Sequence, residues 1–260
     1  MRHGLARRIV FLVALSVALE AQLLAGTGAE PPANQLTPAE RAAGWRLLFD
    51  GVSTSGWRGF KKPAFPDKGW VIEDGCLKHE RRGGGGDIIT DRAFNDFEFS
   101  FEWRLGPRSN SGLKYFITER RAGPIGHEYQ IIDDKAYGFA QPGNKQQTAG
   151  FYDILAPTAW QEPRPPSQFN HSRIVVQGSN VQHWLNGLKT LEYELGSPQV
   201  LEAVAASKFK EIEGFGTKLE GHLLLQDHGG EVWFRNLKLR ELPAQRVRKR
   251  TSPPARRGAG

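Results

Sequence analysis

Apolar and polar side chains alternate at every second position through much of the middle of the chain. The clearest case is residues 97–105, FEFSFEWRL, where five apolar side chains alternate with four polar ones. This period of two predicts a β-strand with one face in a core and the other toward solvent. Similar patterns predict strands over residues 70–73, 76–79, 87–90, 112–118, 127–132, 150–154, 172–177, 181–185, 189–195, 222–226 and 232–240.

Turn and cap residues separate these segments. Asp74-Gly75 and Asn186-Gly187 are pairs typical of two-residue hairpin turns. Thr37, Pro38 and Glu40 form a capping-box pattern that opens a short helix ending at Gly44, and Ser197-Pro198 opens a second one that continues through Val200 to Ala206. About a dozen strands with two minor helices predict an all-β, antiparallel sandwich of the jelly-roll type.

The organisation predicted from the sequence is one β-sandwich domain over residues 44–242, after a lead-in at 30–43 that holds the first helix. No linker or internal repeat divides residues 36–242. With 39% hydrophobic and 24% charged residues, the chain can form a packed core, and wholesale disorder is excluded. The single cysteine, Cys76, excludes an internal disulfide framework and a cysteine-based zinc cluster, so we expect it in the core.

The formal net charge of +7 belongs to the two ends of the chain. Residues 1–8 and 244–260 hold nine of the 35 lysines and arginines and no acids, so residues 9–243 carry 26 basic against 28 acidic side chains. Nucleic-acid binding needs a basic stripe on the folded surface, so we expect no nucleic-acid partner. The tail at 243–260 is rich in Arg and Pro, and we expect it to be disordered, with contact to anionic surfaces by charge alone left open.

The first 29 residues have the layout of a secretory signal peptide. Three arginines precede an apolar run at residues 9–19, and small residues follow at 25–29. The run is too short for a transmembrane helix, which takes about 20 apolar residues. We therefore expect a secreted or periplasmic protein with no transmembrane span, an uncleaved amphiphilic anchor being the alternative.

Seven motifs occur in the order typical of one known family. They are GWRLLFDG (44–51, with Gly56-Trp57 soon after), WVIEDG (70–75), NSGLKYF (110–116), EYQIIDD (128–134), HWLNG (183–187), LQDHG (225–229) and FRNL (234–237). Over these residues the chain resembles the 3-keto-disaccharide hydrolase family. The resemblance implies a concanavalin A-like lectin/glucanase sandwich. It also implies hydrolysis of a glycosidic bond in a sugar already oxidised at its 3-hydroxyl.

The chain departs from the family pattern at two positions. Lys114 stands where many members carry Arg, and Phe151 stands where a smaller aliphatic residue is usual. Both departures bear on which substrate is accepted.

A ketone at C3 makes the C2 proton acidic and places the glycosidic oxygen β to the carbonyl. Cleavage then needs a base near C2, a partner for the enolate and an acid for the leaving oxygen. We predict Glu128 as the base, because strand alternation puts it on one face with Gln130. A solvent-facing Glu128, and an ordinary glycosidase mechanism with two carboxylates, remain alternatives.

Two further catalytic candidates follow from the implied chemistry. Lys114 alternates with Leu113 and Tyr115, so it faces away from the side they bury and is a candidate to stabilise the enolate. His228 follows a predicted strand end, and histidine is the side chain type most used as an acid near neutral pH, which suits protonation of the leaving group. A surface lysine and a structural loop histidine are the alternatives.

Candidate substrate-binding residues carry hydroxyl-binding or ring-stacking side chains, but each also has an ordinary structural explanation, as turn residues, core aromatics or ion-pair partners. They are Asn110, Ser111, Gln130, Tyr152, Arg173, Trp184 and Asp227.

The cofactor is unknown from the sequence. His171, His183 and His222 lie on different strands, and their spacing matches no metal motif, so a divalent metal ion is left open. Asp133 and Asp134 follow a strand and are expected in a turn. Gly83–Gly86 lacks the Lys-Ser/Thr of a phosphate loop and is interpreted as a flexible hairpin tip. A non-catalytic carbohydrate-binding module remains the alternative function.

Overall fold

The computed structural model describes residues 32–244. The chain divides into two units, at residues 1–32 and 33–260, and the described residues lie almost entirely in the second. The predicted signal peptide, and the basic tail from residue 245 onward, lie outside the described residues.

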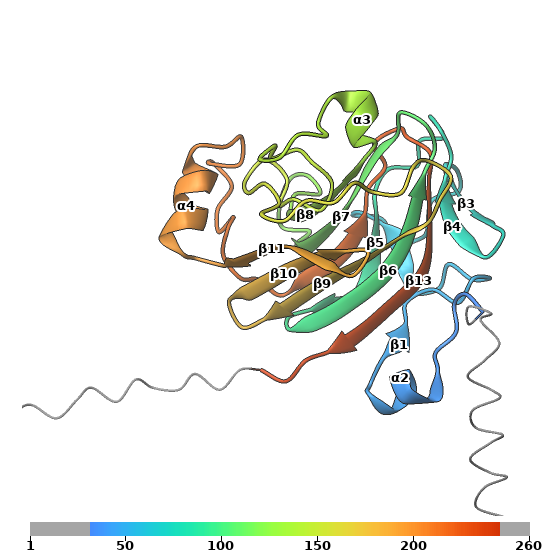
Figure 1. Ribbon diagram of the computed structural model, residues 1–260. Coiled ribbons are helices and arrows are strands. Elements are labelled where there is room, and N and C mark those ends of the chain that lie inside the picture. The colour runs from blue at the N-terminus through green and yellow to red at the C-terminus, as the bar shows by residue number, and fades with distance from the viewer. Residues whose placement is uncertain (1–31, 245–260) are drawn as a thin grey trace, which may run out of the picture. The chain divides into compact units, whose positions relative to one another are not determined.

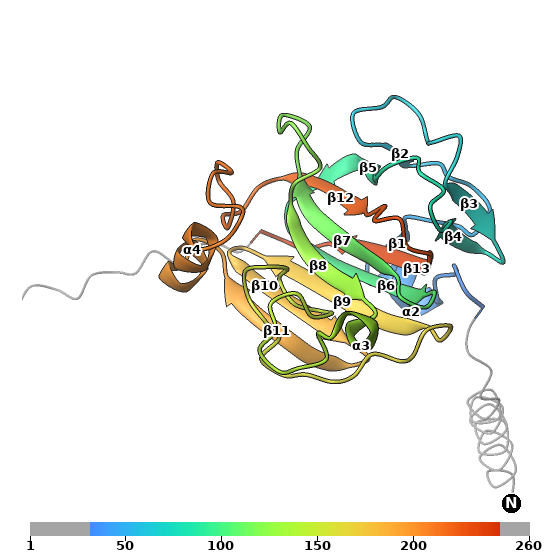
Figure 2. The same ribbon diagram turned by 90° about the horizontal axis from the view of Figure 1, so that it is seen from above.

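Two antiparallel sheets pack face to face in the second unit (Figures 1 and 2). The larger sheet has the strand order β11-β10-β9-β6-β13-β4-β3, with β1 also paired to β13. The smaller sheet has the order β2-β5-β12-β7-β8. The larger sheet comprises β1 (Arg46–Leu47), β3 (Trp70–Glu73), β4 (Cys76–His79), β6 (Phe97–Leu105), β9 (Asn170–Gln177), β10 (Asn180–Leu185), β11 (Leu188–Glu194) and β13 (Val232–Glu241), and the smaller comprises β2 (Trp57–Gly59), β5 (Ile88–Phe94), β7 (Asn110–Ile117), β8 (His127–Ile132) and β12 (Gly221–Leu225). The predicted antiparallel sandwich is confirmed.

The core between the sheets is built from the alternating apolar faces of the strands. On β6 all five apolar side chains are buried, as the period of two predicts. Some buried polar side chains form hydrogen bonds with one another across the core. The indole nitrogen of Trp103 donates to Ser172 Oγ at 2.8 Å, and Tyr129 OH lies 2.8 Å from the same oxygen. Cys76 is buried.

The predicted caps and hairpins form. α2 (Pro38–Ala42) begins with a complete capping box between Thr37 and Glu40, and α4 (Pro198–Ala205) is capped by Ser197. Asp74-Gly75 joins β3 to β4, and Asn186-Gly187 joins β10 to β11; all four residues have positive φ, as a type I′ turn requires. Asp133 caps a further helix, α3 (Asp134–Tyr137), so the expected turn after β8 is a helix start.

Two segments differ from the sequence-based expectation. Residues 150–154 form a tight turn with only isolated bridges from Phe151, because positive φ values at Ala149 and Asp153 interrupt an extended strand. Gly83–Gly86 is no hairpin tip, since it passes from β4 in the larger sheet to β5 in the smaller one. This glycine segment forms hydrogen bonds with three side chains, those of His79, Trp70 and Asp227.

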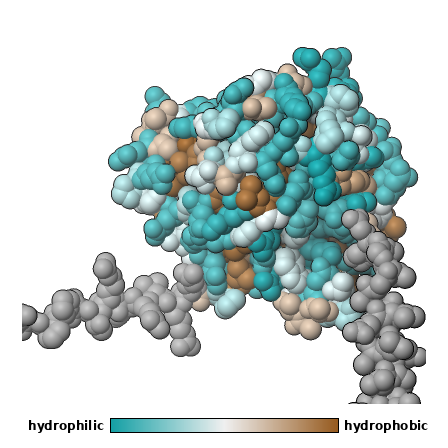
Figure 3. Space-filling model, in the orientation of Figure 1, coloured by the Kyte–Doolittle hydropathy of each residue, from teal (hydrophilic) through white to brown (hydrophobic). Residues whose placement is uncertain are grey.

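The face seen in Figure 3 is mostly hydrophilic, with small separate apolar patches. On the outer face of the larger sheet, charged side chains pair with one another, as Glu98 does with Arg173 and Arg240. No helix within residues 32–244 is both long and apolar enough to cross a membrane.

Candidate active site

A polar pocket that is open to solvent lies on the outer face of the smaller sheet. Its floor comes from β7 and β8, which lie side by side in Figure 2. Their core-facing residues alternate with the ones that face the pocket, which is why Lys114 and Glu128 share this surface. The pocket is lined by Asn110, Lys114, Pro124, Ile125, Gly126, Glu128, Gln130, Tyr152, Lys208, Phe209, Gln226 and His228.

Strand register places Lys114 directly opposite Glu128. The Lys114 ammonium nitrogen lies 3.8 Å from Glu128 Oε2. The Glu128 carboxyl group lies over Gly112 on the neighbouring strand, where an added Cβ would be only 2.6 Å from Oε1. A glycine at this strand position therefore makes room for the carboxylate.

Glu128 is a buried carboxyl group, with 7% of its surface exposed. Burial raises its pKa to about 7, the positive charges of Lys114 and Lys208 act in the opposite direction, and the charge of Asp87 raises the pKa further. A carboxylate with this pKa is a good general base near neutral pH, because its protonation state and its basicity are both suited to proton abstraction.

Asp87 is a second carboxylate near the pocket. Its Oδ2 lies 4.0 Å from the Lys114 nitrogen, and Oδ1 accepts a hydrogen bond from the backbone of Asp227 at 2.8 Å. Burial raises the pKa of Asp87, against the attraction of Lys114.

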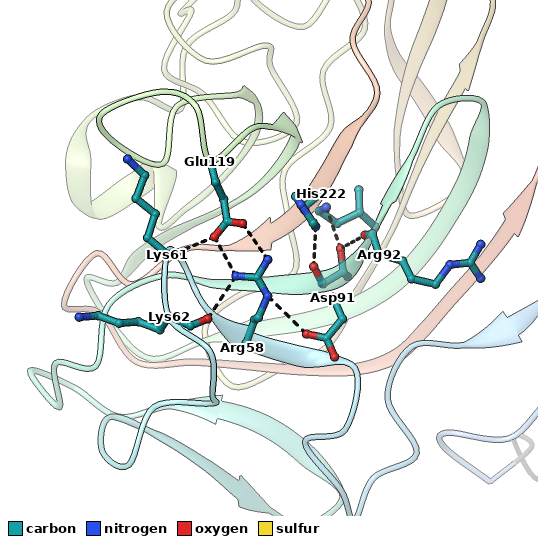
Figure 4. A network of polar contacts seen from close by, with 9 residues as sticks. Arg58, Lys61, Lys62, Asp91, Arg92, Glu119 and His222 are labelled. Carbon is teal, nitrogen blue, oxygen red and sulfur yellow. Dashed lines mark hydrogen bonds and ion pairs between the residues drawn. The ribbon is translucent and has the colours of Figure 1, made fainter.

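One wall of the pocket is the end of the β7–β8 loop at Pro124–Gly126. Near the start of this loop, Glu119 accepts two hydrogen bonds from Arg58 on β2, at 2.7 and 2.9 Å (Figure 4). Arg58 Nε also lies 3.6 Å from Asp91 of β5. The network therefore joins the loop to two strands of the smaller sheet.

Another part of the pocket lining carries aromatic side chains and a lysine. Tyr152 is held by its backbone amide, which donates to Glu128 O at 3.1 Å. Lys208 Nζ lies over the Tyr152 ring at 4.3 Å and donates to its hydroxyl at 3.1 Å. Lys208 and Phe209 belong to the segment between α4 and β12, and Phe209 stacks on buried Phe215, which fixes the position of that segment.

Two amide side chains present buried oxygens at the pocket. Within residues 32–244, neither Asn110 Oδ1 nor Gln226 Oε1 has a hydrogen-bond partner. Buried acceptors are almost always paired, so these oxygens are suited to hydroxyl groups of a ligand.

The structure brings together six of the ten residues predicted for the site. These six are Asn110, Lys114, Glu128, Gln130, Tyr152 and His228. His228 is exposed and follows β12.

Ser111 and Asp227 lie outside the pocket. Ser111 is not in a turn; it lies on β7, is fully buried, and donates to Gln226 O at 2.9 Å. The Asp227 carboxylate accepts from the backbone of Gly86 and Gly229 and lies 3.0 Å from His79 Nε2. Both side chains therefore hold the chain segments around the pocket and do not face it.

Arg173 and Trp184 lie on the outer face of the larger sheet, away from the pocket. Arg173 pairs with Glu98 at 2.9 Å and lies 4.1 Å from the centre of the Trp184 ring. Strand alternation cannot tell which of two sheets a strand joins, so these two residues could not be excluded from the sequence.

Sequence reasoning missed Asp87, Lys208, Phe209 and Gln226. Gln226 stood inside a recognised motif, next to Asp227, and Gly112 in a strand signalled a close approach. Asp87 and the Lys208–Phe209 pair come from distant segments and carry no local signal.

The three histidines considered for metal binding have separate structural partners: His171 contacts Ser100, His183 contacts Tyr115 and Ala149, and His222 contacts Thr90. Within residues 32–244, no group of three or more His, Cys, Asp or Glu side chains is arranged to hold a metal ion.

The fold and the site define an antiparallel β-sandwich enzyme with a polar pocket on one sheet. A sequence profile described as the 3-keto-alpha-glucoside-1,2-lyase-like domain matches residues 44–240. The chain belongs to this family, and it is an enzyme of the glycosidase kind.

Individual relatives agree with this assignment. The chain is 34% identical over 232 residues to a 3-keto-disaccharide hydrolase of Bacteroides thetaiotaomicron, covering 77% of this chain and 79% of that protein. A crystal structure from Parabacteroides distasonis ATCC 8503, provisionally named a glycosyl hydrolase, superimposes with a TM-score of 0.74 at 32% identity, covering 82% of this chain and all of that one. A second structure from the same organism has a TM-score of 0.60 at 23% identity, covers 76% of this chain and 99% of that one, and supports the fold alone.

Proposed function

We propose that this enzyme cleaves the glycosidic bond of 3-keto-glycosides, including 3-keto-disaccharides, by elimination and hydration. The observation that carries the proposal is the buried Glu128 carboxyl group, whose pKa is raised to about 7, beside the Lys114 ammonium in one pocket. The family and the named function of the Bacteroides relative support the substrate class. The buried amide oxygens of Asn110 and Gln226 suit a polyhydroxylated ring.

In the first step, Glu128 takes the proton from C2 of the keto-sugar. The electron pair of the C2–H bond forms a C2=C3 double bond, and the negative charge moves to the C3 oxygen. Lys114 stabilises this enolate by its positive charge, which acts strongly because the Lys114 and Glu128 side chains are both largely buried. The base needs to be deprotonated, so we expect kcat/KM to rise with pH through about 7.

In the second step, the enolate reforms the C3 carbonyl and a C1=C2 double bond, and the C1–O bond breaks. His228, at the rim of the pocket, donates a proton to the departing oxygen. Water then adds across the double bond, with its oxygen on C1 and a proton returned to C2. The net change is hydrolysis, with no change in oxidation state.

The test is to incubate the purified protein with a 3-keto-glucoside and with the same glucoside unoxidised. We expect cleavage of the keto-sugar alone, proton exchange at C2 in deuterated water, and a loss of at least a hundredfold in Glu128→Gln. The proposal is contradicted if neither sugar is cleaved in the presence of any of several added divalent metal ions. Full activity of Glu128→Gln contradicts it as well. Binding without turnover would favour a carbohydrate-binding module.

We also propose that the enzyme is exported. The charged start, the short apolar run and the small residues through Ala29 support a cleaved signal peptide. Fractionation of cells, with N-terminal sequencing of the mature protein, tests this; an uncleaved cytoplasmic chain contradicts it.

A further inference from the structure

The Lys114 ammonium lies between two carboxylates and is bonded tightly to neither. Its nitrogen is 3.8 Å from Glu128 Oε2 and 4.0 Å from Asp87 Oδ2, both beyond the 2.7–3.2 Å range of an N–H···O hydrogen bond. Within residues 32–244 its hydrogen bond is to Pro124 O, and at 3.4 Å that bond is long as well. The ammonium therefore keeps donor capacity for a ligand in the pocket.

Asp87 is held in place by the segment around it. The backbone amide of Asp227 donates to Asp87 Oδ1 at 2.8 Å. Asp227 in turn accepts from Gly86 and lies 3.0 Å from His79, which is fully buried. The carboxylate of Asp87 therefore belongs to a segment that several hydrogen bonds hold in place.

Four charged or titratable side chains face Glu128 or line the same pocket. Lys114 comes from β7, Lys208 from the segment after α4, Asp87 from the residue before β5, and His228 from the residues after β12. The two lysines lower the pKa of Glu128, and Asp87 raises it. An ammonium bonded directly to Glu128 would lower that pKa much further and would block the carboxylate.

We propose that Asp87 is a positioning residue of this site, which holds Lys114 midway between two carboxylates and so keeps Glu128 free and basic. The proposal deepens the proposed function and rests on Glu128 being the base. Asp87 does not touch substrate in this role; it acts through Lys114 and through its own charge.

The informative variant is Asp87→Asn. The amide oxygen retains an acceptor for the Asp227 backbone amide, whereas the negative charge is lost. Lys114 then moves onto Glu128 as a direct ion pair. The matched control is Asp67→Asn, which removes an equal charge from an exposed residue outside the pocket.

The first readout needs no substrate. The full chain, labelled with ¹³C at the glutamate carboxyl carbons, is titrated by NMR, and the Glu128 signal is assigned by its loss in Glu128→Gln. We expect the Glu128 midpoint to fall by about one pH unit in Asp87→Asn and to stay in place in Asp67→Asn. An unchanged midpoint in Asp87→Asn overturns the proposal.

The second readout is the pH profile of kcat/KM on a 3-keto-glucoside. We expect its acid limb to shift downward with the NMR midpoint and the plateau to fall about 3- to 10-fold, because a weaker base is now paired with Lys114. Asp87→Glu, which restores the charge, returns the limb toward the wild-type position. A limb that stays in place while only thermal stability falls assigns Asp87 a structural role and overturns the proposal.

The two readouts separate this inference from the proposed function. If the wild-type enzyme does not cleave keto-sugars, the proposed function fails, and the carboxyl titration still decides the role of Asp87. If Asp87→Asn does not fold, Asp87→Ser, which is smaller and also uncharged, takes its place in both measurements.

Discussion

At the scale of single residues, the buried carboxyl group of Glu128 makes the stability of the fold depend on pH. Its pKa is raised from 4.5 to about 7 in the folded protein. The folded state therefore holds its proton more tightly than the unfolded chain, and this residue's contribution to stability declines as pH rises from about 4.5 through 7.

The first prediction follows from this sign. Glu128→Gln removes the ionisation, so we expect a variant without activity but about 1–3 kcal/mol more stable than wild type at pH 8, with little difference at pH 4. Urea unfolding at both pH values measures it. A variant less stable at pH 8 would show that ionised Glu128 stabilises the fold.

The second prediction concerns Gly112. In Gly112→Ala the new methyl group would meet the Glu128 carboxyl at 2.6 Å and displace it from Lys114. We expect kcat/KM to fall 10- to 100-fold, because a small misplacement of a base has this effect. Steady-state kinetics measures it.

Gly123→Ala is the control for Gly112→Ala. It lies on the β7–β8 loop, where the nearest atom to an added Cβ is 3.9 Å away. We expect this variant to keep wild-type kinetics; equal losses in the two variants would contradict the specific role of Gly112.

Residue-level chemistry was predictable where one strand carries it. Alternation alone predicts that Glu128 and Gln130 share one face of their strand. It also predicts that Lys114 faces away from the side that Leu113 buries. The structure places Lys114, Glu128 and Gln130 in one pocket. Ser111 and Asp227 were misassigned because their side chains bond backbone, which a motif cannot reveal. Asp87 needed the fold, since it reaches Lys114 from a different segment.

At the scale of elements, the ion pair between Arg58 and Glu119 helps to attach the β7–β8 loop to the smaller sheet. Hydrogen bonds from Arg58 lower the pKa of Glu119 to about 2, and the Lys61 backbone amide adds a further bond. A carboxyl group with a depressed pKa contributes stability above its unfolded value, and that contribution is lost as pH falls from about 4.5 to 2.

The third prediction is that Glu119→Gln is less stable than wild type at pH 7 and nearly equal to it at pH 2. Because the Glu119 side chain is one-third exposed, we expect a difference at pH 7 of only about 1 kcal/mol or less. Thermal melts across this range measure it. A difference that persists unchanged at pH 2 would assign the effect to packing and not to the ion pair.

Elements were predictable where turn chemistry and alternation agree, as at the two hairpins and at β6. The strand predicted over residues 150–154 does not form, because Asp153 adopts a positive φ. The alternation of side chains along a sequence does not report backbone dihedral angles. The two- and three-residue strands β1 and β2 are too short to show a period.

At the scale of the whole molecule, the last strand occupies an interior place in the larger sheet. β13 lies between β6 and β4 and also pairs with β1, so strands from both ends of the sequence meet there. Nothing in the local sequence indicates this order, because register between distant segments is set by the assembled core.

The fourth prediction tests this arrangement. A chain ending at Gly230 lacks β13, so we expect it to be insoluble or without a cooperative thermal transition. A chain ending at Ala244 retains β13 and is the control, for which we expect a wild-type melt. A folded, cooperative chain ending at Gly230 would contradict the dependence on β13.

The position of β13 has a consequence for synthesis. A chain emerging from the ribosome holds all the other strands of residues 32–244 before Val232–Glu241 appears, and the facing backbone edges of β4 and β6 stay unpaired until then. Such edges pair readily with strands of other nascent chains. The yield of soluble protein should therefore depend on how quickly β13 emerges from the ribosome, compared with how often neighbouring nascent chains meet.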